Sequence, residues 1–202
     1  PVTGGHEFAG EVVELGEGVD AFAVGDRVVT EQILPCGGCH FCRTGSYWMC
    51  TRSAVFGFKH VCPGGFAEYV LIPASGLCHT IPDSMTWEQA ALVEPVACGM
   101  HALERARLTS ADVVVVAGLE GIGLAMLSIA AARLPRLLIG VDVREDRLAR
   151  AAEFGADVAL PAGPDVAERV RDLTGGLGCD VYIEASGAQA SVGTGLAALR
   201  NQ

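Results

Sequence analysis

The sequence predicts an α/β fold, in which a small, partial antiparallel β-barrel is followed by a partial, doubly wound parallel sheet. Residues 7–30 contain short apolar runs separated by glycine turns, a pattern typical of antiparallel strands. From residue 113 onwards, strand-like runs alternate with helix-like segments, which favours parallel strands covered by helices on both faces. We expect the first domain to occupy residues 1–98 and the second residues 99–202.

The composition is that of a folded protein with a substantial core, because 50% of the 202 residues are hydrophobic and 19% are charged. The formal charge of −10 argues against nucleic acid as a partner, since nucleic-acid binding requires a basic surface. No signal peptide is recognisable, so we expect a cytoplasmic protein. A disulfide scaffold is disfavoured, because such chains are shorter and less hydrophobic.

A histidine and a glutamate, His6 and Glu7, stand at the start of the predicted barrel. Neighbouring His and Glu residues can both face a metal ion when they end a strand. Such a pair also arises by chance, so the pair alone leaves ligation open.

The cysteine-rich stretch 36–50 has the spacing C-x2-C-x2-C-x7-C, formed by Cys36, Cys39, Cys42 and Cys50. Two-residue gaps let a turn curl its sulfur atoms around one point, and tetrahedral zinc accepts four thiolates. A [4Fe–4S] cluster prefers a last gap of three residues followed by proline. A redox dithiol lacks its usual βαβ context here. The stretch therefore predicts a closed, structural zinc lobe.

A turn and a strand are expected over residues 64–73, and a helix is expected to begin after Thr86. Thr86 can cap this helix, because Gln89 lies three residues further on, the spacing of a capping box. Glu94 lies among apolar residues, where a carboxylate usually has a partner. That partner is a backbone cap, a salt bridge or a metal ion.

Residues 113–142 have the order strand, glycine turn, helix, strand and acidic residue, which is the layout of a dinucleotide-binding unit. Glycines let the backbone approach a pyrophosphate at the helix N-terminus. Asp142, 19 residues after Gly123, is placed to accept hydrogen bonds from a ribose 2′-OH. The clustered glycines disfavour a transmembrane helix over residues 113–132, whereas a βαβ unit without nucleotide stays open. The expected turn comprises Gly118, Gly121, Ile122 and Gly123.

One residue departs from the G-x-G-x-x-G pattern, because Glu120 stands where the second glycine is usual and Gly121 follows one place late. A carboxylate beside a pyrophosphate is electrostatically unfavourable. Either the Glu120 side chain points away and Gly121 provides the close approach, or nucleotide affinity is reduced. Arg147, one turn into the next helix, could lie over an adenine ring or could be a solvated surface residue.

The remaining chain continues the alternation, with helices over residues 145–154, 166–173 and 188–199 and strands over residues 158–160 and 180–184. Ligands of such sheets bind at the carboxyl ends of the strands. This rule places Gly118, Asp142 and Ser186-Gly187 along one edge.

Several of these motifs occur in the order seen in one known family: Gly5-His6-Glu7, Gly25-Asp26-Arg27-Val28, the four cysteines, Gly64-Gly65-Phe66-Ala67-Glu68-Tyr69, Glu94-Pro95 and the glycine turn with Asp142. The chain resembles the zinc-dependent medium-chain dehydrogenase/reductase superfamily over nearly its whole length. His6-Glu7 and Glu94-Pro95 are similar to the polyol branch of sorbitol, threitol, erythritol and threonine dehydrogenases. The resemblance implies a GroES-like catalytic domain and a Rossmann domain, both incomplete.

The resemblance also implies chemistry and cofactors. A catalytic zinc would be held by a cysteine, His6 and Glu7, with Glu94 as a direct or water-linked neighbour, and a structural zinc by the four cysteines. The implied reaction is oxidation of a secondary alcohol of a polyol to the ketone with NAD. NADP is less expected, because Asp142 would repel a 2′-phosphate, and an amino alcohol such as threonine is the alternative substrate. The implied partners are small-molecule alcohols and further copies of the chain in a dimer or tetramer, with no membrane.

Two departures from the family stand out. The family's zinc cysteine lies upstream of the His-Glu motif, but only five residues precede His6 and none is cysteine. The family also continues beyond residue 202. We therefore expect a chain truncated at both ends, with poor activity in isolation. A catalytically inactive member that keeps only structural zinc and nucleotide binding is the alternative.

Overall fold

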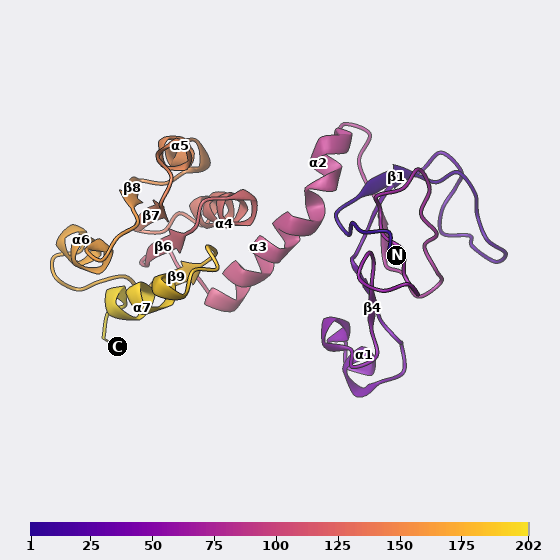
Figure 1. Cartoon of the computed structure of the whole chain (residues 1–202), viewed down its shortest axis with the longest axis horizontal. Coiled ribbons are helices and arrows are strands. Elements are labelled where there is room, and N and C mark those ends of the chain that lie inside the picture. Colours follow the sequence, from indigo (N-terminus) through magenta and orange to yellow (C-terminus); the bar gives the residue numbers. More distant parts are fainter. Residues whose placement is uncertain (202) are drawn as a thin grey trace. The chain divides into compact units, whose positions relative to one another are not determined.

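The computed structural model describes residues 1–201 and divides into two compact units, Pro1–Glu94 and Pro95–Gln202 (Figure 1). Helix α3 (Val93–Ala106) crosses this division. The domain boundary expected after Cys98 falls within the same helix.

Two small antiparallel sheets form the framework of the first unit. Strand β2 (Arg27–Thr30) lies between β1 (Ala9–Glu11) and β5 (Cys78–Thr80), and β3 (Ile33–Leu34) pairs with β4 (Ala54–Val55). This confirms the antiparallel arrangement that the glycine-punctuated runs predicted.

The core of this unit is small and is centred on an aromatic residue. Phe56 is fully buried beside Leu34 and Cys62, and the Phe8 ring meets it edge-on at 5.5 Å between centroids. Edge-on aromatic pairs of this kind add to the stability that burial itself provides. The segment after His6 and Glu7 is thereby fixed to the core by its Phe8 side chain.

Between β3 and β4 the chain forms a lobe with one short helix and one 3₁₀ turn. Helix α1 spans His40–Arg43, and η1 spans Tyr47–Met49. The Tyr47 hydroxyl donates to Glu31 Oε1 at 3.0 Å, which ties the lobe to the end of β2.

The expected strand over residues 64–73 is wrong, since this segment forms no strand. Its first three N–H groups donate to backbone carbonyls of the segment before His6, but in an irregular order. The donor–acceptor pairs are Gly64 with Thr3, Gly65 with Gly5 and Phe66 with Gly4. Phe66, Tyr69 and Leu71 are exposed, whereas Val70 and Ile72 pack against the core around Phe56.

The predicted helix start at Thr86 is confirmed. The Gln89 N–H donates to Thr86 Oγ1, and the Thr86 N–H donates to Gln89 Oε1, which is a complete capping box before α2 (Trp87–Ala91). The Arg27 guanidinium lies 4.1 Å from the centre of the Trp87 ring and links β2 to α2.

The second unit contains a four-stranded parallel sheet with the order β8-β7-β6-β9 (Figure 1). Its strands are β6 (Val113–Ala117), β7 (Leu137–Asp142), β8 (Val158–Pro161) and β9 (Val181–Glu184). All five residues of β6 are buried, because helices cover both faces of the central strands.

The helices divide between the two faces as the alternation predicted. Val113 and Val115 pack with α6 (Val166–Leu173) and α7 (Gln189–Ala198), whereas Val114 and Val116 pack with α3 and α4 (Gly121–Ala132). Helix α5 (Glu145–Arg150) and the turn η2 (Ala151–Phe154) connect β7 to β8.

Residues 113–132, for which a transmembrane helix was disfavoured, form strand β6 and helix α4. Across residues 1–201, no helix has the length and apolar character needed to cross a bilayer.

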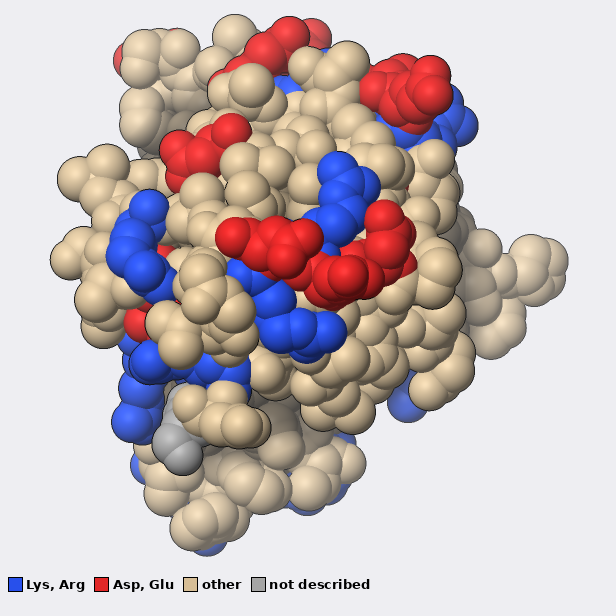
Figure 2. Space-filling model, turned by 90° about the vertical axis from the view of Figure 1, so that its left-hand side faces the viewer, with Lys and Arg blue, Asp and Glu red and all other residues tan. Residues whose placement is uncertain are grey.

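On the face shown in Figure 2, acidic and basic side chains lie interspersed among uncharged ones.

Candidate functional site

The four sulfur atoms of Cys36, Cys39, Cys42 and Cys50 converge in the lobe between β3 and β4. All lie within 4.8 Å of one another, and the Cys39 and Cys42 sulfurs are 3.5 Å apart. All eight cysteines of the chain are free of disulfide bonds. Zn–S bonds of about 2.3 Å in a tetrahedron place sulfur atoms about 3.8 Å apart. The donor set and its spacing therefore fit a closed four-thiolate zinc site.

The surroundings of the thiols favour partial ionisation. The Gly38 backbone N–H, with further help from the Cys39 N–H, Cys50 and Arg52, lowers the pKa of Cys36 to about 6. Burial and its thiol neighbours raise the pKa of Cys42 to about 11. Several thiolates can share so small a volume only when a cation is present, because like charges at this distance repel.

A second cluster of ligand atoms combines His6, Glu7 and Glu94, all within 4.8 Å of one another. His6 Nε2 lies 3.9 Å from Glu7 Oε1, and the two side chains are 31% and 49% exposed. Glu94 lies in the first turn of α3, far from the other two in sequence. One imidazole and two carboxylates are donors that zinc accepts, and partial exposure leaves room for a further ligand.

The backbone before His6 is held by glycines. The Gly64–Phe66 N–H groups donate to the Thr3, Gly5 and Gly4 carbonyls at 2.8–3.0 Å. A β-carbon on Gly64 would come within 2.1 Å of the Gly5 oxygen, and Gly5 itself has a positive φ of 94°. These contacts require glycine and place His6 at the end of a clamped segment. The Phe58 ring lies 5.2 Å from the His6 ring.

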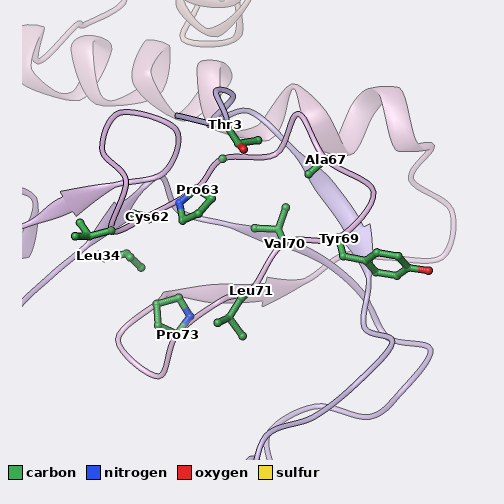
Figure 3. A pocket seen from close by; sticks show the side chains of 11 residues that line it. Thr3, Leu34, Cys62, Pro63, Ala67, Tyr69, Val70, Leu71 and Pro73 are labelled. Atoms are coloured by element: carbon green, nitrogen blue, oxygen red, sulfur yellow. The ribbon is translucent and has the colours of Figure 1, made fainter. Parts of the chain in front are cut away.

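A pocket of about 370 Å³ lies behind the clamped segment and is lined by Thr3, Leu34, Cys62 and Pro63, among others (Figure 3). The Tyr69 side chain points away from Leu34 and Pro73 (Figure 3). Among the described residues that line it, none is acidic and none is His, Lys or Arg. Its polar side chains are those of Thr3, Cys62 and Tyr69.

The glycine turn after β6 is compact. Gly118 has a φ of 94°, and its N–H donates to the Val141 carbonyl at 2.7 Å. A β-carbon on Gly123 would lie 1.7 Å from the Gly118 oxygen, whereas one on Gly121 would meet nothing within 4 Å. Gly118 and Gly123 are thus required by the fold, while Gly121 and the 42% exposed Ile122 face open space at the start of α4.

Asp142, at the carboxyl end of β7, is almost completely buried and anchors this turn. Its Oδ2 accepts from the Leu119 N–H at 2.7 Å, and its Oδ1 accepts from the Arg144 N–H at 2.9 Å. Each carboxylate oxygen keeps a second lone pair for another donor. The carboxylate can therefore hold the turn and still accept a hydrogen bond from a hydroxyl group.

The Glu120 side chain turns towards helix α5. The Glu120 side chain is 78% exposed and pairs with Arg147 Nη2 at 2.6 Å. The other terminal nitrogen of Arg147 lies 3.6 Å from Asp142 Oδ2. The Arg147 guanidinium therefore lies between two carboxylates and is not a solvated surface group.

A cleft of about 550 Å³ runs along the carboxyl ends of the parallel strands, where sequence analysis placed a ligand. Its wall includes Gly118, Asp142, Arg147 and Ser186. The predicted edge of the sheet is therefore hollow.

Glu184, at the end of β9, lies beside the cleft-lining Ser186 and was not singled out from the sequence. Burial raises its pKa, but hydrogen bonds from the Ser186 hydroxyl and from the Ser186 and Gly187 N–H groups outweigh this and hold the pKa below its usual value. The Ser186-Gly187 loop that borders the cleft is thus fixed by a carboxylate at the end of β9. The signal was a glutamate two residues before Ser186-Gly187 at a strand end.

Two family models match the chain. Residues 1–83 match the alcohol dehydrogenase GroES-like domain, and residues 121–202 match the zinc-binding dehydrogenase family. The erythritol/L-threitol dehydrogenase of Mycolicibacterium smegmatis is 45% identical over 97% of this chain and 55% of its own length. The sorbitol dehydrogenase of Halalkalibacterium halodurans is 40% identical over 100% of this chain and 59% of its own length.

Solved structures agree with these matches. A protein from Sinorhizobium meliloti that is described as a zinc-binding dehydrogenase was solved bound to NADP. It superposes with a TM-score of 0.91 at 30% identity, over 99% of this chain and 58% of its own. The chain thus spans little more than half the length of these proteins.

Proposed function

Because the chain belongs to the zinc-dependent alcohol dehydrogenases of the medium-chain dehydrogenase/reductase superfamily, we propose that it carries the zinc and nucleotide sites of an NAD-dependent polyol dehydrogenase. The observation that carries this proposal is the convergence of His6, Glu7 and Glu94 within 4.8 Å. A structural role alone does not require an imidazole and two carboxylates to meet at a partly exposed position.

In this proposal His6 and Glu7 bind the catalytic zinc, and Glu94 is a direct or water-linked neighbour. Bound zinc supplies a Lewis acid for the alcohol oxygen, and the nicotinamide supplies the hydride acceptor. The clamp of Gly64–Phe66 on Thr3–Gly5 fixes the backbone that presents His6. Together with His6, the two carboxylates would hold the ion and offset its charge.

The four cysteines are proposed to hold the structural zinc. Four protein ligands close the coordination sphere, so this ion would brace the lobe between β3 and β4 and would not take part in the reaction. The lowered pKa values of Cys36 and Cys39 support this role, because zinc binds thiolates rather than thiols.

The nucleotide is proposed to bind in the cleft beside Gly118, with a ribose hydroxyl donating to Asp142. NAD is favoured over NADP by the surroundings of Asp142. Arg147 is paired with Glu120, and Arg144 donates twice to Asp146, at 2.9 and 2.8 Å. Neither guanidinium is therefore ready to receive a 2′-phosphate.

The proposed substrate is a small polyol whose secondary alcohol is oxidised to a ketone, as the names of the two relatives suggest. The chain spans 55% and 59% of the lengths of these relatives, so the activity is proposed for a protein of their full length. Assembly into a homo-oligomer stays a prediction.

Metal content tests the proposal against an inactive relative that keeps only the structural ion. The zinc-equilibrated chain should contain about two zinc ions, because it offers two separate donor clusters. His6→Ala should remove about one, whereas His60→Ala, at an exposed histidine outside both clusters, should remove none. A content of one that His6→Ala leaves unchanged would contradict the catalytic site.

A further inference from the structure

Glu120 stands at the junction of two turns that border the nucleotide cleft. Its backbone is extended, with φ −86° and ψ −172°, so a residue other than glycine is accommodated without strain. Its side chain makes no capping hydrogen bond to α4 and turns instead to Arg147 of α5. The pair thus joins the turn after β6 to the helix after β7.

Arg147 is held from two sides by this arrangement. Nη2 donates to Glu120 Oε1 at 2.6 Å, and Nη1 lies 3.6 Å from the buried carboxylate of Asp142. With 28% of its side chain exposed, Arg147 is more constrained than Glu120. All three residues line the cleft.

We propose that Glu120 is a positioning residue for cofactor selectivity, which disfavours nucleotides with a 2′-phosphate by keeping Arg147 paired. The proposal rests on the proposed nucleotide site and explains why a carboxylate is tolerated in its glycine turn. Paired with Arg147, Glu120 is locally neutralised and does not confront a pyrophosphate as an isolated charge.

NAD⁺ and NADP⁺ would affect the Glu120–Arg147 ion pair differently. A ribose 2′-OH donates to Asp142 and leaves the Glu120–Arg147 pair intact. A 2′-phosphate at the same place meets the charge of Asp142 and needs a guanidinium for compensation. A 2′-phosphate that bound Arg147 would break the ion pair with Glu120. The glutamate would then be unpaired near a second anionic group. Arg144 offers no easy substitute, because Asp146 already holds it by two hydrogen bonds.

Calorimetric titration of the chain with NAD⁺ and with NADP⁺ tests this proposal through the ratio of the two dissociation constants. In Glu120→Gln the ratio of the NADP⁺ constant to the NAD⁺ constant should fall about fivefold, the size expected for one exposed ion pair. Glu153→Gln is the matched control, since it removes an exposed carboxylate that pairs with Arg150 at 3.8 Å elsewhere on the unit.

A double-mutant cycle separates positioning of Arg147 from a general charge effect. In an Arg147→Gln background, Glu120→Gln should no longer change the ratio. Equal tightening of both nucleotides in Glu120→Gln, or the same change of ratio without Arg147, would overturn the inference while leaving the proposed function intact. If the unaltered chain binds neither nucleotide, the proposed nucleotide site is wrong and the inference falls with it.

Discussion

A β-carbon placed on Gly64 would lie 2.1 Å from the carbonyl oxygen of Gly5, the residue before His6. No side chain can relieve this clash, because both partners are backbone. The Gly64 N–H also donates to the Thr3 oxygen, so the two segments cannot separate without losing that bond. The position of the imidazole in the candidate metal cluster therefore depends on a glycine nearly sixty positions away.

Gly64→Ala should displace the segment before His6 and weaken metal binding at His6 while sparing the cysteine cluster. We expect a loss of about 1–3 kcal/mol in unfolding free energy, in the range of backbone strain and lost packing, together with loss of about one zinc ion per chain. Denaturant unfolding and metal analysis measure both. Gly10→Ala is the matched control, since a β-carbon there meets nothing within 4 Å. Unchanged zinc content in Gly64→Ala would contradict the proposed clamp.

The cysteine lobe makes the stability of the metal-free protein depend on pH. The Gly38 N–H is the largest of the causes that lower the pKa of Cys36 from 9.0 to about 6 in the folded state. A lowered pKa stabilises the fold fully above the unfolded value, and this contribution declines from pH 9 towards pH 6. Cys42, raised to about 11, acts oppositely above pH 9.

Unfolding of the chelated, reduced chain should therefore become easier as pH falls from 9 to 6, and Cys36→Ser should flatten this dependence. Cys98→Ser, at an exposed cysteine outside the cluster, serves as the control. An equally steep slope in Cys36→Ser would show that other groups govern the dependence.

Two glycines of the nucleotide turn should separate folding from binding. Gly121→Ala should fold as well as the unaltered chain or slightly better, because its β-carbon meets open space and alanine favours a helix. If Gly121 provides the close approach to the pyrophosphate, NAD⁺ affinity should drop about tenfold. Gly123→Ala should instead lose stability, since its β-carbon would lie 1.7 Å from the Gly118 oxygen. Thermal melts and calorimetric titration read the two effects, and undiminished NAD⁺ binding in Gly121→Ala would assign the approach elsewhere.

The parts of the site that follow from short sequence distances were predictable. Two-residue gaps among the first three cysteines leave little freedom for their sulfurs, and Thr86 with Gln89 specifies a capping box within four residues. The βαβ pattern likewise placed Asp142 at the carboxyl end of a parallel strand, because such patterns follow directly from hydrophobic periodicity.

The parts that depend on how distant turns meet were not predictable. Glu120 and Arg147 are 27 positions apart, and their pairing depends on two turns brought together by the β6–β7 register. The apolar run after Gly65 suggested a strand, but this segment forms none. The N–H groups of residues 64–66 donate to the carbonyls of residues 3–5 in an irregular order, unlike the regular hydrogen bonds between paired strands. Neither outcome is encoded in a local pattern.

The loop bordering the cleft should depend on the charge of Glu184. Hydrogen bonds from the Ser186 hydroxyl and from the Ser186 and Gly187 N–H groups outweigh the effect of burial and lower the pKa of Glu184 from 4.5. The stabilisation is thus complete above the unfolded pKa and is lost as pH falls below it. Glu184→Gln should cost about 1–2 kcal/mol at pH 7, the size of charge-assisted hydrogen bonds at a partly exposed position. It should also reduce the acid sensitivity of unfolding as pH falls below 4.5, the ordinary pKa of a glutamate. Denaturant titrations across this window, with Glu14→Gln at an exposed loop position as the control, measure both effects. A variant as stable as the unaltered chain would mean that the loop keeps its shape without the carboxylate.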